Sequence, residues 1–436
     1  MGSYVPHSDA DRKEMLAVCG FEKIEDLYAH LPEEVKLKDG LDIPVGMSEL
    51  EVRRAVSSMA SKNKIFPTIF RGAGAYKHFI PSIVKSVIGK ETFFTAYTPY
   101  QAEVSQGVLQ SIFEYQTMIC ELTGMDVANA SVYDGATAAA EGVAMCKDRK
   151  RKKALIAATA HPHIIDTIKT YCFGNEMEIE MIPEKDGKID MDYLKVHMSA
   201  DVAGVYVQHP NFYGTLEEAK EIGEIVHEAG AKYILGVNPI AISVMKSPRE
   251  YGADIAVGDG QPLGLSIAFG GPYLGFMACT EKMTRQLPGR IVGQTTDNSG
   301  KVGYVLTLQA REQHIRREKA SSNICSNQAL CALAIGVYCA SMGASGIKEA
   351  AIQSTSKAHY MAEELEKIGY TVKNNGAFFH EFVTTSKAPV ERVMSALEEQ
   401  DILGGYPLSN GTILWCCTEM NTKEEIDKVV SILKEV

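Results

Sequence analysis

Short apolar runs alternate with amphipathic stretches through the middle of the chain. Runs of this kind have the length and composition of buried strands, and the stretches between them have helical spacing. The alternating segments are residues 154–158, 165–172, 178–182, 202–208, 216–229 and 233–237. This alternation predicts a three-layer α/β domain with a mainly parallel sheet.

The N-terminal part of the chain has a different pattern. Residues 8–31 read as two short helices, with Ser8 as the cap of the first and Gly20 at its end, and residues 47–60 form a third amphipathic segment. No strand pattern occurs among them. We therefore expect a helical arm over residues 1–65, packed either across a neighbouring subunit or domain or as an extra layer on its own domain.

The C-terminal part alternates helices and strands again, on a smaller scale. Gly343 and Gly346 are expected to interrupt a long helix near a hinge, and Trp415 lies in an apolar strand pattern typical of a core. The sequence thus predicts a large domain over residues 66–325 and a small α+β domain over residues 326–436.

Composition narrows the class of protein. A chain of 436 residues with 45% hydrophobic content can bury a large core, and the absence of any apolar run of about 20 residues argues against a membrane span. The net charge of −11 argues against a nucleic-acid surface. The start carries no signal pattern, so we expect a cytoplasmic protein. Ten cysteines without CxxC pairs predict neither a metal site nor a disulfide framework.

A glycine-rich stretch at residues 252–276 is the first candidate for chemistry. It reads as a buried strand at 254–257, a loop with a turn at 270–272, and a second strand at 274–279. This arrangement resembles the segment in which fold-type I pyridoxal-phosphate enzymes carry their Schiff-base lysine. No lysine occurs between Lys246 and Lys282, and the corresponding place holds uncharged residues around Gln261. The resemblance therefore implies the fold of a cofactor enzyme without its nucleophile.

Other elements of such a cofactor site are present in altered form. Gly135 and Thr137 open an alanine-rich helix whose amides and dipole favour an anion, although close packing on a sheet needs the same small residues. The resemblance places His161 where a ring stacks on the cofactor, and Asn238 where these enzymes carry an aspartate for the pyridine nitrogen. A neutral amide does not stabilise a pyridinium. We expect a degenerate cofactor pocket formed by Gly135, Thr137, His161, Asn238 and Gln261.

Two further segments concentrate polar groups. The loop FTAYTPYQAEVSQG, residues 94–107, displays hydroxyl, amide and carboxylate groups, as binding loops do, although a packed turn explains the same residues. The cationic segment REQHIRR, residues 311–317, fits either anion binding or an interface salt-bridge cluster. A second cationic run at 147–153 is better read as a solvated helix end than as a docking patch.

These segments, together with SNIC at residues 322–325, resemble the P-protein family of the glycine cleavage system over nearly the whole chain. The family has two homologous halves, of which one carries the lysine, and this chain resembles the lysine-less alpha half, subunit 1. The resemblance implies an oxidoreductase, inactive alone, that decarboxylates glycine with a lysine-bearing beta partner, subunit 2, as an alpha2beta2 complex. Pyridoxal phosphate is then held by the partner's lysine, and the aminomethyl group passes to the lipoyl arm of H-protein.

The residues expected to complete the partner's site in trans are Tyr97, Tyr100, Gln101, Arg311 and His314. They supply oriented polar groups and exclude water around the glycine carboxylate and the lipoyl arm. The alternative is a non-catalytic regulatory or scaffolding homologue that shares the fold and contributes no residue to an active site. Activity that requires both chains discriminates the first hypothesis from the second.

Overall fold

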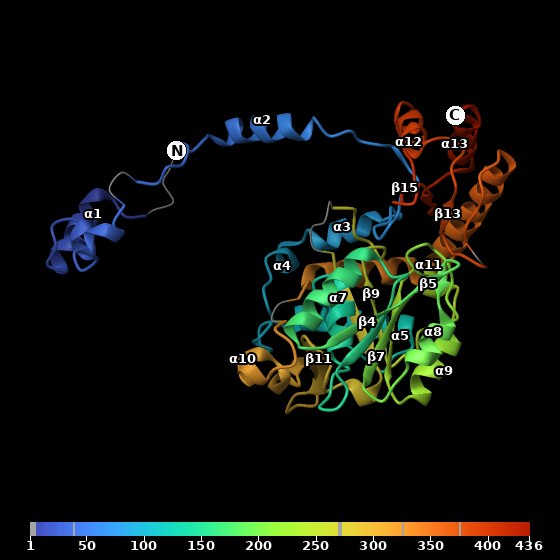
Figure 1. Cartoon of the computed structure of the whole chain (residues 1–436). Coiled ribbons are helices and arrows are strands. Elements are labelled where there is room, and N and C mark those ends of the chain that lie inside the picture. The colour runs from blue at the N-terminus through green and yellow to red at the C-terminus, as the bar shows by residue number, and fades with distance from the viewer. Residues whose placement is uncertain (1–5, 38–39, 269–272, 325–326, 375) are drawn as a thin grey trace. The chain divides into compact units, whose positions relative to one another are not determined.

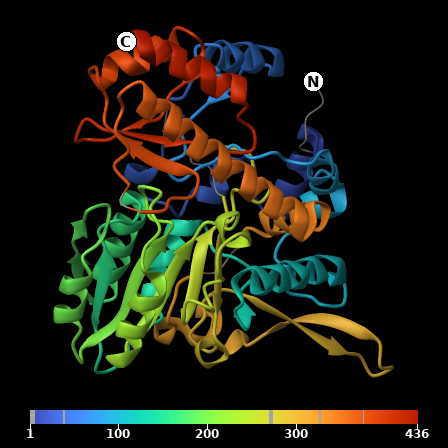
Figure 2. The ribbon, with the colours of Figure 1, turned by 90° about the vertical axis from the view of Figure 1, so that its right-hand side faces the viewer.

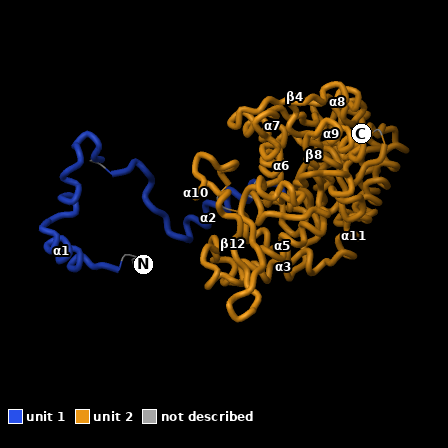
Figure 3. The backbone as a smooth tube through the Cα atoms, turned by 90° about the horizontal axis from the view of Figure 1, so that it is seen from below, with its two compact units in different colours: residues 1–65 blue, residues 66–436 orange. Residues whose placement is uncertain are grey.

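The computed structural model describes residues 6–37, 40–268, 273–324, 327–374 and 376–436 (Figure 1). The chain divides into two compact units, Met1–Ile65 and Phe66–Val436, which Figure 3 colours separately. The division after Ile65 falls at the predicted end of the arm. The predicted domain boundary between residues 325 and 326 lies inside the second unit and stays a prediction. The expected turn at residues 270–272 lies outside the described residues.

Unit 1, Met1–Ile65, consists of short helices joined by irregular chain. They are α1 (Asp9–Val18), η1 (Ile24–Tyr28), η2 (Glu33–Val35) and α2 (Glu49–Ala60). Ser8 caps α1 through reciprocal hydrogen bonds with Asp11, and Gly20 follows the end of α1 with a φ of 78°, as predicted. The second predicted helix forms only the 3-10 turn η1, whose start is capped by the Asp26 carboxylate through the backbone N–H groups of Glu22 and Lys23.

Unit 1 has no hydrophobic core of its own. None of its described residues is buried, and large apolar side chains of α1 and α2, including Val18, Val56 and Met59, are exposed. Because burial of apolar surface is the main favourable term in folding, a segment of this kind needs another surface to cover it.

A seven-stranded sheet forms the centre of unit 2, Phe66–Val436 (Figure 2). Its strands are β2 (Val127–Ala128), β3 (Lys153–Ala157), β4 (Glu178–Ile182), β7 (Val202–His209), β8 (Lys232–Val237), β9 (Ile255–Asp259) and β10 (Gly275–Cys279). The order is β2-β10-β9-β8-β7-β3-β4. Strands β4, β3, β7, β8 and β9 are parallel, and β10 is antiparallel to both its neighbours. The predicted α/β class with a mainly parallel sheet is confirmed.

Helices cover both faces of this sheet. They include α5 (Gln106–Thr123), α6 (Gly135–Ala144), α7 (Pro162–Gly174), α8 (Met191–His197) and α9 (Ala219–Glu228). Adjacent residues of β3 show the two layers, because Leu155 belongs to the same core as Tyr115 of α5, whereas Ile156 belongs to the core that contains Ala139 of α6 and Ile168 of α7. A strand buried on both faces is apolar throughout, which explains the short continuous runs in the sequence.

The hairpin of β11 (Ile291–Thr296) and β12 (Val302–Thr307) projects from the body of unit 2 (Figure 2). Gln106, at the start of α5, donates to the Tyr304 carbonyl over 2.8 Å and accepts from the Tyr304 N–H over 2.9 Å. These bonds fix the hairpin beside the 94–107 loop. Other short elements of unit 2 are α3 (Ser82–Ile88), α4 (Glu91–Phe94), β5 (Glu184–Lys185), β6 (Lys188–Ile189) and α10 (Gln313–Arg316).

The longest helix is α11 (Ala329–Lys367), and it is bent at Gly343, whose φ of 62° and ψ of 176° are not helical. The predicted interruption is thus at Gly343, while Gly346 remains helical. By length and composition alone α11 is apolar enough to cross a membrane. Its buried side chains, such as Ile335 and Met361, pack in two cores of unit 2, which is the behaviour of a core helix.

The C-terminal part contains a second, smaller sheet. This sheet has the order β13-β16-β15, with β13 (Glu381–Thr384), β15 (Tyr406–Pro407) and β16 (Ile413–Cys416). A separate parallel pair joins β14 (Ile402–Leu403) to β1 (Thr68–Ile69), and the helices of this part are α12 (Val390–Glu398) and α13 (Lys423–Glu435). Trp415 is fully buried in this core, as predicted, and donates to Thr384 Oγ1 over 2.9 Å. Val372 is joined to Thr384 of β13 by a single antiparallel bridge.

Candidate functional site

A cavity of about 340 Å³ lies at the carboxyl edge of the parallel strands. Its walls are the ends of β7, β8 and β9, the first turns of α6 and α7, and the loop of residues 73–76. This edge is where open α/β sheets bind their ligands. Of the predicted pocket residues, Gly135, His161 and Asn238 line the cavity, whereas Thr137 and Gln261 do not.

Two carboxylates occupy the anion-binding end of helix α6. Asp134 accepts a 2.7 Å hydrogen bond from the Thr137 N–H, and Asp259 accepts a 2.9 Å bond from the Gly135 N–H. The second oxygen of Asp259 accepts from the Gln261 N–H over 2.8 Å. Burial raises the pKa of Asp259 to about 6 although these amides stabilise its charged form. The amides that the sequence assigned to a phosphate are therefore bound by the chain's own side chains.

His161 is also bound within the chain. Its Nδ1 accepts from the His163 N–H over 3.1 Å, so the ring proton is on Nε2, which donates to the Ala73 carbonyl over 2.9 Å. Burial lowers the pKa of His161, which keeps the ring neutral. Its ring lies edge-on to Phe212 at a centroid distance of 5.0 Å. Both ring nitrogens hold the surrounding backbone in place.

Asn238 closes the turn that follows β8. Its Oδ1 accepts from the N–H groups of Ile240 and Ala241, over 2.9 and 3.2 Å. Its Nδ2 is buried and has no partner among the described residues. A side chain used in this way orients a backbone turn and carries no charge for a pyridine nitrogen.

Gln261 holds the loop that covers the cavity. Its amide donates to the carbonyls of Tyr76 and Leu265, both over 2.8 Å, and accepts from the Tyr76 N–H over 2.9 Å. The side chain is 1% exposed, and all its hydrogen-bonding groups are directed at backbone. Gln261, near which the sequence suggests a missing lysine, therefore clamps the backbone of this loop and does not line the cavity.

The same loop is tied to the small sheet. Glu381 of β13 accepts from the Ala73 N–H over 2.7 Å and from the Tyr76 hydroxyl over 2.8 Å. Burial raises the pKa of Glu381 to about 7. At Gly74, with a φ of 106°, a Cβ atom would lie 2.8 Å from His161 Nε2, so only glycine allows the loop to approach the ring this closely. The loop is therefore clamped over the cavity from two sides.

These residues do not fit pyridoxal phosphate. No lysine lines the cavity, and the Gly135 and Thr137 amides are already bound to Asp259 and Asp134. Two carboxylates at the helix terminus repel a phosphate, which is itself negatively charged. Asn238 offers no carboxylate for the ring nitrogen. Asp134 and Asp259 escaped sequence reasoning because neither stands in a recognisable motif.

The 94–107 loop presents a contrasting surface. Tyr97 is 81% exposed and Tyr100 is 53% exposed, and Gln101 is exposed as well. Phe94 and Val104 add exposed apolar side chains to the same loop. Pro99 is buried and anchors the loop between the two tyrosines. Polar and apolar groups are thus displayed to the outside of this chain.

The structure brings two of the predicted trans residues together. The rings of Tyr100 and His314 lie edge to face at a centroid distance of 6.5 Å, and His314 Nδ1 is 3.7 Å from the Glu312 carboxylate. Arg311 is directed elsewhere, since its guanidinium donates to the carbonyls of Leu308 and Gly289 over 3.0 and 2.9 Å. Arg311 therefore braces the chain that follows β12, while His314 stands beside the loop.

Arg290, which sequence reasoning missed, joins this group. Its Nη2 donates to Tyr100 Oη over 2.8 Å, and its Cζ lies 5.2 Å from the centre of the Tyr100 ring. The signal available in the sequence is a cation directly before an apolar strand, in the order Pro288, Gly289, Arg290, Ile291. A buried cation at such a position calls for an explanation.

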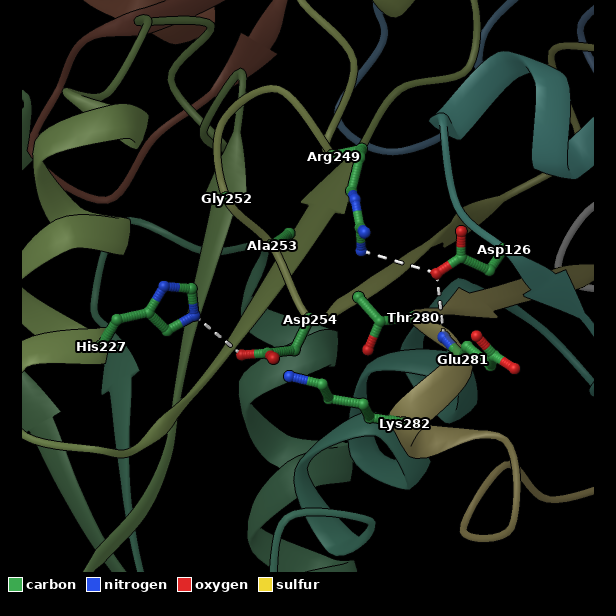
Figure 4. Close-up of a pocket in the computed structure, with 9 residues that line it drawn as sticks. All are labelled: Asp126, His227, Arg249, Gly252, Ala253, Asp254, Thr280, Glu281 and Lys282. Carbon is green, nitrogen blue, oxygen red and sulfur yellow. Dashed lines mark hydrogen bonds and ion pairs between the residues drawn. The ribbon is translucent and has the colours of Figure 1, made fainter.

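A second cavity, of about 360 Å³, lies at the opposite edge of the sheet (Figure 4). Its charged groups are paired with one another, as Arg249 with Asp126 at 3.7 Å and His227 with Asp254 at 3.0 Å. None of the predicted site residues lines it. Within the described ranges, no group of three or more His, Cys, Asp and Glu side chains is placed to hold a metal ion.

Side chains of the cationic run at 147–153 form hydrogen bonds and ion pairs within the chain. Arg151 donates to the carbonyls of Val202 and Ala229 over 3.0 and 3.2 Å, and Lys153 pairs with Glu180 at 2.5 Å. These contacts favour the structural interpretation of the run over a docking patch.

Comparison with known proteins identifies the family. The model of the glycine cleavage system P-protein matches residues 2–433. A probable glycine dehydrogenase (decarboxylating) subunit 1 from Carboxydothermus hydrogenoformans is 50% identical over 439 residues, 99% of each chain. The crystal structure of an inhibitor-bound glycine decarboxylase (P-protein) of the glycine cleavage system is similar with a TM-score of 0.93 and 40% identity over 100% of both chains.

A more distant structure shows how widely the fold is shared. The sphingosine-1-phosphate lyase of Burkholderia pseudomallei has a TM-score of 0.67 at 15% identity, over 93% of this chain and 94% of that one. This likeness concerns the fold alone, and it confirms the predicted fold-type I architecture. The full-length matches establish that the chain belongs to the glycine cleavage system P-protein family.

Proposed function

We propose that this chain is the lysine-less subunit of a two-subunit glycine dehydrogenase (decarboxylating), and that it completes an active site on its partner. One observation carries the proposal. The amides at the anion-binding end of the chain's own cavity are bound by its own side chains and no lysine lines that cavity, while the 94–107 loop displays the largely exposed Tyr97 and Tyr100. Full-length similarity to proteins named subunit 1 supports the same assignment.

The partner in this proposal is the homologous, lysine-bearing subunit 2, in an alpha2beta2 complex. Pyridoxal phosphate bound by the partner's lysine supplies the electron sink for loss of the glycine carboxylate. The lipoyl arm of H-protein accepts the aminomethyl group. We place the complex in the cytoplasm, in contact with neither nucleic acid nor membrane.

The contribution of this chain is orientation and exclusion of water. Tyr97, Tyr100 and Gln101 offer hydroxyl and amide groups from one loop, and the exposed rings supply the dry wall that strengthens polar interactions in a site. His314 stands beside Tyr100 and adds an imidazole to the same face. Arg311 supports this face from behind through its two backbone bonds.

Unit 1 provides a second contact with the partner in this proposal. Its described residues include no buried side chain, and α1 and α2 both carry exposed apolar residues. An arm without a core gains stability only when another surface covers it. Either interpretation of the arm supplies such a surface, and in this proposal the surface is that of the partner subunit.

The test is reconstitution. The chain is coexpressed with the lysine-bearing homologue, and exchange of bicarbonate carbon with glycine is measured in the presence of lipoylated H-protein. We expect the two chains to copurify and exchange to require both. Full activity of the lysine-bearing chain alone would favour the scaffolding alternative and refute the proposal.

A further inference from the structure

Arg290 is buried, and two of the three nitrogens of its guanidinium group have no hydrogen-bond partner among the described residues. The residue is 2% exposed, and only Nη2 is engaged, in the 2.8 Å bond to Tyr100 Oη. Nε and Nη1 have no hydrogen-bond partner among the described residues. A buried cation without its full set of acceptors destabilises a fold, because it loses hydration that nothing replaces. Stability of this chain alone therefore does not account for an arginine here.

The backbone around Arg290 is firmly held. The Ala130 N–H donates to the Arg290 carbonyl over 2.7 Å, and Asn129 Nδ2 donates to the Pro288 carbonyl over 2.9 Å. Gly289 adopts a φ of 75°, which directs the chain into β11. The guanidinium thus projects from a rigid strand toward a loop that is otherwise exposed.

The chemistry of this contact fixes the direction of the Tyr100 hydroxyl. A guanidinium has donors and no acceptor, so Tyr100 Oη accepts the bond and keeps its own proton for another group. No described residue accepts that proton, and the side chain is 53% exposed. The result is a phenol whose oxygen is held by the chain and whose O–H remains available to an acceptor on another molecule. The guanidinium near the ring face, at 5.2 Å, restricts the ring further.

We propose that Arg290 is a positioning residue that fixes Tyr100 as a hydrogen-bond donor toward the active site shared with the partner subunit. This inference rests on the proposed function, because it needs the Tyr100 loop to act in trans. It adds a residue that neither the sequence motifs nor the exposed surface indicates. Lysine cannot replace the arginine, because an ammonium on a flexible stem lacks the rigid planar fork.

The test is a double-mutant cycle in the reconstituted complex. Tyr100→Phe is expected to lower kcat of the exchange reaction about 100-fold, the usual effect of losing one donor aligned in the transition state. Arg290→Lys is expected to lower kcat at least about 10-fold with KM for glycine unchanged, because the donor remains present and is misaligned. In the Tyr100→Phe background, Arg290→Lys should cause no further loss.

A spectroscopic measurement on the same chain separates positioning from folding. With 3-fluorotyrosine at position 100, the ¹⁹F resonance should move and broaden in Arg290→Lys while the melting temperature of the complex stays near that of the parent. Arg290→Gln, which keeps a planar donor, serves if the lysine variant does not fold. It should retain more activity than Arg290→Met.

The outcomes distinguish the inference from the function on which it rests. An unchanged rate in Tyr100→Phe overturns the role of the loop and this inference together. A reduced rate in Tyr100→Phe with full activity in Arg290→Lys overturns the inference alone. Losses that multiply in the double variant also overturn it, since they show that Arg290 acts independently of Tyr100.

Discussion

The cavity at the carboxyl edge of the sheet and the 94–107 loop differ in how far their polar groups are bound within the chain. In the cavity, the amides of Gly135 and Thr137 and the ring of His161 are bound by groups of the chain itself. On the loop, Tyr97 is exposed and the guanidinium behind Tyr100 is incompletely bound. Groups that a chain satisfies internally serve its fold. The exposed groups of the loop are available to another molecule.

The two regions are joined by one short segment. Asn129 and Ala130 hold the backbone of the Pro288–Arg290 turn, and a few residues later Asp134 caps α6 at the cavity. One end of this segment therefore holds the Pro288–Arg290 turn beside the 94–107 loop, and the other end supplies the side chain that caps α6 at the cavity. The contrast between them rests on a few side chains, which makes it accessible to mutation.

The strongest test of this difference is an attempt to bind pyridoxal phosphate in the cavity. The isolated chain, treated with pyridoxal phosphate and then borohydride, should carry no stoichiometric phosphopyridoxyl group, because no lysine lines the cavity and two carboxylates occupy its anion site. Peptide mass spectrometry checks this, with the reconstituted complex as the positive control. A specific label on a lysine next to the cavity would show that the site is open after all.

Gln261→Lys tests whether the clamp is structural. The substitution removes three hydrogen bonds to backbone and buries a charge, so we expect a loss of about 3–5 kcal/mol in the free energy of unfolding. The variant should show no glycine decarboxylation without the partner, since Asn238 supplies no carboxylate to stabilise a pyridinium. Chemical denaturation measures the first effect and the exchange assay the second.

Gln101→Lys is the matched control for that experiment. It makes the same change of side chain on the exposed loop and should alter the free energy of unfolding by less than about 0.5 kcal/mol. Equal stability losses in the two variants, or activity of Gln261→Lys alone, would contradict the contrast between closed and open regions.

Tyr97→Phe tests the open region. The hydroxyl is exposed and has no partner in the described chain, so its removal should leave the melting temperature unchanged. If the hydroxyl is a donor aligned in the transition state, the exchange rate of the complex should fall about 100-fold. The absorbance of the partner's bound cofactor serves as the control for assembly.

Arg311→Lys should behave in the reverse way. Its guanidinium holds two backbone carbonyls, so replacement should lower the melting temperature and reduce the exchange rate by less than about 10-fold. A stable Tyr97→Phe complex with the parent rate would place Tyr97 among the structural residues. A large loss of rate in a stable Arg311→Lys complex would move Arg311 among the functional ones.

Local sequence pattern was enough to predict the fold and the exposed 94–107 loop, but not the hydrogen bonds inside the cavity. The strand runs at 154–158, 202–208 and 233–237 are recognisable because burial on both faces makes them apolar throughout. The bond between Gly135 and Asp259 joins residues 124 positions apart, and no local spacing announces it. The exposed tyrosine loop could be predicted, because displayed polar groups leave a signature in composition.

The errors in the prediction have the same origin. Gln261 was assigned to the cavity by its position after a strand, yet the loop at Tyr76, far away in the sequence, turns its amide elsewhere. Arg290 was overlooked because one arginine before an apolar strand resembles an ordinary strand end. Only its burial and its incomplete hydrogen bonding distinguish it.

The clamp of Glu381 on the covering loop is expected to depend on pH. Burial raises the pKa of this carboxyl from 4.5 to about 7, so the folded chain keeps a proton that the unfolded chain has lost. Stability falls with rising pH wherever the native state binds more protons, and this group therefore weakens the fold progressively between about pH 4.5 and pH 7, by up to about 3 kcal/mol. Glu381→Gln has no such titration. The glutamine amide can still accept a hydrogen bond from the Ala73 N–H and can form a hydrogen bond with the Tyr76 hydroxyl.

The free energy of unfolding of both chains, measured by denaturation from pH 5 to pH 7.5, should thus shift in favour of Glu381→Gln as the pH rises. Buried His380 and His209, whose pKa values burial lowers, destabilise both chains equally as the pH falls below about 6.5, so their effect cancels in the difference. A constant difference across this range would show that Glu381 does not hold a proton in the folded chain. A difference of the opposite sign would show that the clamp works as a carboxylate, bound by Ala73 and Tyr76 strongly enough to offset its burial.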